Sequence, residues 1–332
     1  MKEFAYQRAN DVDSALALLG QPGSARFLAG GTNLVDLMKT GVEYTDRLID
    51  IRALPLNDID VEGDGSIQIG AMVTNSDLAA HPEVRRRYPA LSQAILAGAS
   101  GQLRNAATVA GNLLQRTRCA YFANVSMPCN KRQPGSGCPA VSGENHNHAI
   151  LGWTSSCVAT HPSDMAVPLA AFDARVSFVT ARGRGELSLD QLYLPVGSTP
   201  HVETALPAGA LITGVTLPVA RIAVHSRYRK VRERASYAFA TGSIAAALDV
   251  RDGRVADARI ALGAVAARPW RAHTAEAELR GKPADRESFV RAADAELAAA
   301  RPLRGNAYKL RLARNLILTT LSELVESQGD AA

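Results

Sequence analysis

The first part of the chain alternates between short apolar runs and segments with helical spacing. Residues 11–19 have the spacing of a short helix with an aspartate cap at Asp11 or Asp13, and residues 25–29 form a strand-like apolar run. A second helical pattern, residues 34–38, ends at a glycine, and residues 47–51 are typical of a buried strand. The pattern predicts a small unit of alternating strands and helices.

Beyond about residue 59 the pattern changes. Residues 66–73 alternate as a strand does, Ser76-Asp77 is typical of a helix cap, and residues 91–99 predict a helix broken by glycines. Residues 165–172 have helical apolar spacing, while residues 169–189 and 211–217 return to the strand pattern. Between these parts lies an irregular tract rich in Pro, Gly, Asn and Cys, residues 116–160, and structureless loops of that length are usually functional.

A third unit begins near residue 222. Its pattern predicts strands at 227–231, 238–250 and 255–263, then helices at 275–279, 285–300 and 306–326. Strands followed by helices favour a sheet with helices against one face, so the predicted fold class is α+β.

Composition excludes several classes of protein. The chain has 332 residues and a net charge of +5, which is ordinary for a folded protein. No apolar run approaches the roughly 18 residues of a membrane span, so no span is expected. The N-terminus carries an acid and soon becomes polar, which argues against a signal peptide. The basic residues gather only at 227–234, a pattern that a helix face or an anionic cofactor explains better than nucleic acid.

Small-residue loops with polar side chains occur three times. Leu28-Ala29-Gly30-Gly31-Thr32-Asn33-Leu34 leads from a strand into a helix, where free N–H groups suit an anion such as a phosphate. Thr108-Val109-Ala110-Gly111-Asn112 and Thr160-His161-Pro162-Ser163-Asp164 repeat the combination of a turn with hydroxyl, amide or carboxylate groups. Each is also typical of an ordinary cap or turn, but together they favour a nucleotide-sized ligand. The dinucleotide and P-loop signatures are absent from the sequence.

All of the chain's cysteines lie in the irregular tract, as Cys119-x9-Cys129-x8-Cys138-x18-Cys157. Two disulfides are possible but unnecessary in a chain with an ample core. A structural zinc site usually has paired ligands two to four residues apart, which this spacing lacks, although His146 and His148 are near. Four thiolates can also hold an iron–sulfur cluster, and the spacing alone does not choose among the three.

Taken together, the ordered loops resemble those of the FAD-binding subunits of the xanthine dehydrogenase family of molybdenum hydroxylases. Those subunits carry Ala-Gly-Gly-Thr-Asn-Leu, then Thr-Val-Gly-Gly-Asn, then an element with Pro, Ser and Asp. The cysteine insert makes the chain most similar to the flavin subunits of bacterial periplasmic aldehyde oxidoreductases, which carry an extra [4Fe–4S] cluster. Ala110 departs from the pattern because relatives often have Gly there, and a methyl group is tolerable if φ is negative.

The resemblance implies a two-part FAD domain of the vanillyl-alcohol-oxidase (PCMH) type over residues 1–221, with subdomains of about 1–55 and 56–221. A C-terminal α+β domain of the CO dehydrogenase flavoprotein type would follow at 222–332. The implied FAD-binding residues are Arg26, Phe27, Leu28, Ala29, Gly30, Gly31, Thr32, Asn33, Leu34, Thr108, Gly111, Asn112, Asp164, Ile212, Arg229 and Lys230. The implied [4Fe–4S] ligands are Cys119, Cys129, Cys138 and Cys157.

The same resemblance implies an electron-transfer role without an acid–base dyad or nucleophile in this chain. A molybdenum subunit would oxidise an aldehyde to its acid, a small [2Fe–2S] subunit would relay the electrons, and FAD would pass them to an external acceptor. Export of the folded complex by a partner's signal would make it periplasmic, with a cytoplasmic location as the alternative. The rival functions are a zinc-stabilised scaffold without redox activity and a flavin oxidase that acts alone.

Overall fold

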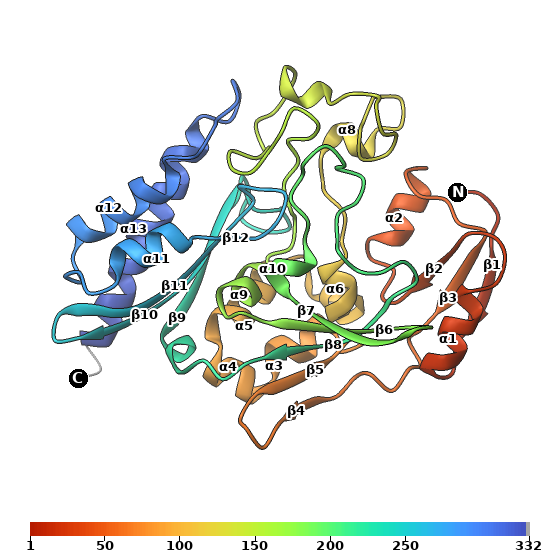
Figure 1. Ribbon diagram of the computed structural model, residues 1–332, viewed down its shortest axis with the longest axis horizontal. Coiled ribbons are helices and arrows are strands. Elements are labelled where there is room, and N and C mark those ends of the chain that lie inside the picture. Colours follow the sequence, from red (N-terminus) through yellow and green to blue (C-terminus); the bar gives the residue numbers. More distant parts are fainter. Residues whose placement is uncertain (330–332) are drawn as a thin grey trace.

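A computed structural model describes residues 1–329. Its N-terminal part is a small parallel sheet in the order β1-β3-β2, at the red end of Figure 1. Parallel neighbours need crossover connections, and here helices supply them. The elements are β1 (Ala5–Arg8), α1 (Val12–Leu19), β2 (Ala25–Leu28), α2 (Leu34–Lys39) and β3 (Arg47–Asp50). The Asp11 cap is confirmed, because its side chain accepts a hydrogen bond from the Ser14 backbone N–H.

The central part is a five-stranded antiparallel sheet in the order β4-β5-β8-β6-β7, packed against helices. Its strands are β4 (Ile59–Val61), β5 (Ile67–Gly70), β6 (Arg175–Thr180), β7 (Gly183–Ser188) and β8 (Leu211–Leu217). Its helices are α3 (Asn75–Ala80), α4 (Pro82–Arg87), α5 (Pro89–Ala97), α6 (Gly101–Ala106), α7 (Val109–Leu113), α9 (Ala166–Ala171) and α10 (Leu189–Leu192). The largest core cluster lies between this sheet and α5, α9 and β10.

Two local predictions for this part are wrong. The cap of α3 is Thr74, whose hydroxyl accepts from the Asp77 N–H, rather than Ser76-Asp77. The strand pattern assigned to residues 169–189 begins inside α9, which ends at Ala171. Leu169 and Ala171 are buried there, and a fully buried apolar run does not distinguish a strand from a helix.

The C-terminal part is an antiparallel sheet in the order β12-β11-β10-β9 with helices against it, at the blue side of Figure 1. The elements are β9 (Ser226–Val231), β10 (Gly242–Arg251), β11 (Arg254–Gly263), β12 (Trp270–Arg271), α11 (His273–Leu279), α12 (Arg286–Leu297) and α13 (Tyr308–Gly329). A 3₁₀ helix at Arg221–His225 precedes them. The predicted strand at 238–250 starts late, because residues 232–241 form a loop between β9 and β10.

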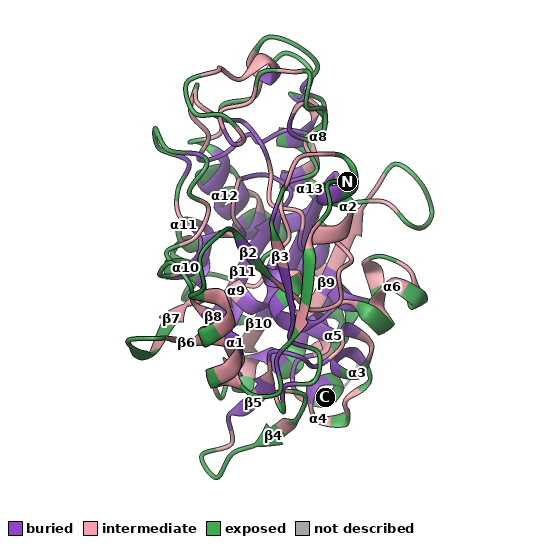
Figure 2. Cartoon of the chain, turned by 90° about the vertical axis from the view of Figure 1, so that its right-hand side faces the viewer, coloured by how far each residue is buried: buried purple, intermediate pink, exposed green. Residues whose placement is uncertain are grey.

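The cysteine insert, residues 116–160, has little regular structure and stands at the top of Figure 1. It contains α8 (Ala120–Ala123) and a 3₁₀ turn at Pro139–Val141. The segment before α13 anchors it: the fully buried Asn306 side chain donates to the carbonyls of His148 and Ala149, at 3.0 and 3.1 Å. In Figure 2 most of the insert is exposed or intermediate, and its buried runs, residues 148–151 and 157–159, lie near its end in the sequence.

Candidate cofactor-binding site

The loop between β2 and α2 presents a row of free backbone donors. Within the described residues, the N–H groups of residues 30–34 donate to no protein acceptor. Gly31 has φ of 71°, and a Cβ on Gly30 would lie 1.9 Å from the carbonyl oxygen of Ala106. Only glycine therefore lets this loop pass so close to the end of α6. Such a row of N–H groups suits a phosphate.

In the second loop, residues 108–112, the backbone N–H groups are not free, because they donate hydrogen bonds within the protein. The N–H groups of Val109 and Ala110 donate to the carbonyls of Val73 and Ala71, and the Thr108 hydroxyl caps α7 by accepting from the Gly111 N–H. Ala110 lies in α7 without positive φ, so its methyl group is tolerated. The loop therefore offers side chains to a ligand, chiefly Asn112.

The third loop is hydrogen-bonded to the second loop and to β9. The Ser163 hydroxyl donates to Asn112 Oδ1 at 2.6 Å and accepts from the Ala166 N–H, at the start of α9. Asp164 turns instead toward β9, where its Oδ2 lies 2.8 Å from Lys230 Nζ and its Oδ1 accepts from the Tyr228 hydroxyl at 2.5 Å. Burial and the negative charge of Asp164 raise the pKa of Tyr228 well above its ordinary value, so Tyr228 stays a donor.

These loops meet around one cleft of about 350 Å³. Of the residues implied by the sequence, the cleft is lined by Thr32, Asn33, Gly111, Asn112, Asp164 and Lys230. Two buried polar atoms on its wall, Asn33 Nδ2 and Asn75 Oδ1, have no hydrogen-bond partner in the described residues. Because buried polar groups are nearly always paired, these orphans fit a polar ligand such as a dinucleotide.

Other residues that line the cleft lie outside the three sequence motifs. Asn75, Arg104 and Arg118 also line it, as do Tyr237 and Phe239 from the loop between β9 and β10. The loop residues are far in sequence from the glycine-rich motifs, so only the tertiary fold brings them there.

Several residues implied by the sequence do not line the cleft. Arg229 lies beside Lys230 on β9, and successive side chains of a strand point to opposite faces, so Arg229 instead pairs with Glu323 of α13. Arg26 is exposed and lies 3.7 Å from Glu43. Ile212 is buried in the core. Phe27 packs against the small N-terminal core, and Leu28, Ala29, Leu34 and Thr108 shape the loops without lining the cleft.

The four cysteines converge on a second, much smaller cavity of about 10 Å³. All four are free, so the disulfide alternative does not hold in this structure. Within the described residues, no group of three or more His, Cys, Asp or Glu is already spaced to hold a metal ion. The donor set, four thiols around one cavity, suits an iron–sulfur cluster chemically.

Two of the thiols have pKa values shifted in opposite directions. Hydrogen bonding with Cys157 lowers the pKa of Cys138 to about 6, which favours the thiolate, the form that binds metal. Burial raises the pKa of Cys119, whose Sγ lies 3.2 Å from His148 Nε2. Lys131 also lines the cavity, and its Nζ lies 3.2 Å from a Glu203 carboxylate oxygen.

Two family models together match nearly the whole chain. The family described as the FAD binding domain in molybdopterin dehydrogenase matches residues 2–220, and the CO dehydrogenase flavoprotein C-terminal domain matches residues 226–324. The chain belongs to this flavoprotein family. The predicted family and its α+β fold with a PCMH-type FAD domain are confirmed.

Individual relatives agree with that assignment. The chain is 50% identical over 325 residues to the aldehyde oxidoreductase FAD-binding subunit PaoB of Escherichia coli (strain K12), covering 97% of this chain and 98% of that protein. It is 30% identical to the carbon monoxide dehydrogenase medium chain of Hydrogenophaga pseudoflava, covering 96% of each. These relatives are oxidoreductase subunits, as the sequence analysis predicts for this chain.

Solved structures share the fold over nearly the whole chain. A carbon monoxide dehydrogenase from Hydrogenophaga pseudoflava superposes with a TM-score of 0.74 at 29% identity, covering 97% of this chain and 96% of that one. Quinoline 2-oxidoreductase from Pseudomonas putida 86 gives a TM-score of 0.76 at 23% identity, covering 98% of this chain and 99% of that one. The matching family model and the relative PaoB support FAD binding, while the individual contacts stay predictions. No helix among residues 1–329 is both long and apolar enough to cross a membrane.

Proposed function

We propose that the chain is the FAD- and [4Fe–4S]-containing electron-transfer subunit of a heterotrimeric molybdenum-dependent aldehyde oxidoreductase. The observation that carries the proposal is the meeting of the three motif loops at one cleft beside the four-cysteine cavity. The full-length similarity to an aldehyde oxidoreductase FAD-binding subunit supports the reaction class. Bound FAD would supply two-electron chemistry that no side chain provides.

The chain's own residues have distinct roles toward FAD. The free N–H groups of residues 30–34 would bind the pyrophosphate, and Asn33 and Asn75 would pair their orphaned polar atoms with the ligand. Lys230, which lines the cleft, carries a positive charge. Its ion pair with Asp164 offsets that charge, so we assign the pair to positioning the cofactor.

The cysteines Cys119, Cys129, Cys138 and Cys157 would hold the cluster. Arg118 lines the FAD cleft and its neighbour Cys119 lines the cysteine cavity, so adjacent residues connect the two proposed cofactor sites. A single zinc ion is the alternative occupant, as in the scaffold hypothesis. Metal analysis of the purified protein distinguishes an iron–sulfur cluster from a zinc ion.

The remaining parts of the proposal concern the assembly. The partners would be a large molybdenum-cofactor subunit and a small [2Fe–2S] subunit, with an external electron acceptor. We place the FAD-binding domain at residues 1–221 and the C-terminal domain at 222–332. Export with a signal-bearing partner would make the complex periplasmic.

Single cysteine replacements test the cluster. Replacing Cys138 with Ser should lower iron content and remove the [4Fe–4S] electron paramagnetic resonance signal while FAD remains bound, because the cleft is separate. Ser142→Ala, in the same insert, is the matched control. An unchanged iron signal in Cys→Ser variants of all four positions would refute the ligand assignment. Co-purification with a molybdenum subunit tests the assembly, and a chain that oxidises aldehydes alone would support the flavin oxidase instead.

A further inference from the structure

We propose that a network of largely buried ion pairs centred on Arg116 couples the two proposed cofactor sites, so that filling the cysteine cavity tightens FAD binding. The inference rests on the proposed function and adds a link between its two sites. Arg116 begins the insert and lines neither the FAD cleft nor the cysteine cavity. It is therefore a positioning residue, which acts through the groups that it contacts.

On the FAD side, Arg116 contacts the glycine-rich loop. Its backbone N–H donates to Asn33 Oδ1 at 2.9 Å. Because the amide oxygen of Asn33 is turned toward the insert, its NH₂ group is left to meet a ligand, and Asn33 Nδ2 has no partner among residues 1–329. The position of Arg116 therefore determines how Asn33, which lines the cleft, presents its donor to FAD.

The side chain of Arg116 joins the insert to two other parts of the fold. Its guanidinium pairs with Glu43, which follows α2, and its Nε lies 2.7 Å from Glu203 Oε1, in the loop between α10 and β8. The guanidinium also lies over the ring of Phe122 in α8, 4.8 Å from the centroid. Arg116 is thus held by three segments that are far apart in the sequence.

Glu203 extends the network to the cysteine cavity. Its Oε1 lies 3.2 Å from Lys131 Nζ, and Lys131 lines that cavity, two residues after Cys129. The Lys131 side chain is 8% exposed, and the other three charged side chains of the network are at most 24% exposed. Charges buried to this extent are screened less by salt than surface pairs are, so the network holds these segments together.

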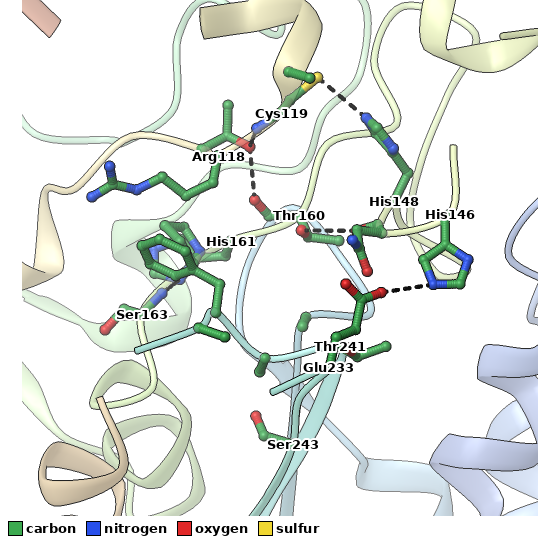
Figure 3. Close-up of a pocket in the computed structure, with 18 of the residues that line it drawn as sticks. Arg118, Cys119, His146, His148, Thr160, His161, Ser163, Glu233, Thr241 and Ser243 are labelled. Atoms are coloured by element: carbon green, nitrogen blue, oxygen red, sulfur yellow. Dashed lines mark hydrogen bonds and ion pairs between the residues drawn. The ribbon is translucent and has the colours of Figure 1, made fainter. Parts of the chain in front are cut away.

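The network is separate from the space that the two sites share. A cavity of about 490 Å³ lies between the insert and the start of β10, and Arg118 and Cys119 line it (Figure 3). In it the Cys119 thiol is directed toward His148, with Sγ 3.2 Å from Nε2. Arg116 lines no part of this cavity, so its ion pairs form an independent connection between the two sites.

The insert is the part of the chain that a metal centre would order most. Among the described residues its regular elements are α8, of four residues, and one 3₁₀ turn. Binding a metal through cysteines of such a segment restricts its motion. A protein already ordered by one ligand loses less conformational entropy when it binds a second, which gives positive coupling. Order imposed around Cys129 is thus transmitted through the ion pairs of Arg116 to Asn33.

FAD titrations on the purified full chain test the coupling. FAD is first removed, and the cysteine cavity is either left loaded or emptied with ferricyanide and EDTA. Flavin fluorescence then reports the dissociation constant of added FAD. We expect this constant to be about tenfold higher in the emptied chain, equivalent to ~1.4 kcal/mol. Hydrogen exchange at the Arg116 amide should also be faster there, because its bond to Asn33 is weakened.

Variants of the network give the matched comparison. Glu203→Gln removes the carboxylate between Arg116 and Lys131, and it should bring the loaded and emptied dissociation constants within about twofold of each other. Lys131→Met breaks the network at its other end, leaves both ion pairs of Arg116 in place, and should reduce the ratio in the same direction. Glu186→Gln, which removes the carboxylate of an exposed ion pair with Arg175, is the control and should keep the wild-type ratio.

Equal FAD dissociation constants in the loaded and emptied wild-type chain would overturn the proposal. So would an undiminished ratio in both Glu203→Gln and Lys131→Met, because a purely structural role of the ion pairs would shift both constants alike. A wild-type chain that holds neither iron nor FAD would instead contradict the proposed function.

Discussion

At the scale of residues, the glycine-rich loop depends on the absence of a side chain at one position. Gly30 passes so close to the end of α6 that any Cβ would collide with the Ala106 carbonyl oxygen. The sequence indicates a phosphate loop at this position, but it does not reveal that a second helix end forces the glycine. The structure therefore gives Gly30 a packing role in addition to its conformational one.

Replacing Gly30 with Ala should displace the loop and lower FAD occupancy. Overpacking of this kind costs about 1–3 kcal/mol of stability. Gly101→Ala is the matched control, because a Cβ there meets nothing within 4 Å. FAD per chain after gel filtration and the thermal midpoint measure the effect. Equal FAD content in both variants would show that the loop tolerates the methyl group.

The buried ion pair at the cleft predicts strong coupling between two residues. The Lys230 and Asp164 side chains are 4% and 10% exposed and lie 2.8 Å apart. Lys230→Met leaves a buried carboxylate unpaired and should cost about 3–5 kcal/mol in urea unfolding. The double variant with Asp164→Asn should recover part of that loss. Additive losses would mean that the two charges do not interact.

The same ion pair depends on a side-chain orientation that the sequence does not predict. The sequence identifies Asp164 and the Arg229-Lys230 pair as candidates near the flavin, but it cannot tell which of two adjacent strand residues faces the cleft. That choice depends on the register of β9 against β10, where Lys230 lies opposite Ser243 and Arg229 opposite Ile244. Asn75, which carries an orphaned oxygen, belongs to no motif and is found only in the fold.

At the scale of elements, most predicted strands and helices occur where the apolar pattern places them, because amphipathic spacing reports local structure directly. Boundaries were less predictable, as at β10, which begins at Gly242 because residues before it form the loop over the cleft. The irregular insert is the opposite case. Its path is fixed by contacts distant in sequence, such as Asn145 Oδ1 accepting from the Gly305 N–H at 2.8 Å.

This anchoring predicts that the insert depends on the segment before α13. Asn306→Ala leaves the His148 and Ala149 carbonyls without their buried donor, a loss of roughly 1–3 kcal/mol. We expect faster proteolysis within residues 116–160, measured by limited digestion and mass spectrometry. Asn57→Ala, at an exposed position, is the control. Identical cleavage rates in the insert would show that other contacts hold it.

At the scale of the whole molecule, three cavities adjoin one another: the FAD cleft, the cavity between the insert and the start of β10, and the cysteine site. Each borders the next through shared residues, with Arg118 and Asp164 at one junction and Cys119 and His148 at the other. The N-terminal, central and C-terminal parts and the insert all contribute walls. The order of the motifs indicates the family, but the sequence does not predict that these cavities adjoin one another.

The most direct test of the account is the cofactor content of the purified chain. Flavin absorbance, together with iron and zinc analysis on the same sample, measures both proposed cofactors at once. The account predicts about one FAD and, for a [4Fe–4S] cluster, about four iron atoms per chain, with little zinc. Colourless protein with stoichiometric zinc and no iron would contradict it and support a zinc-stabilised scaffold.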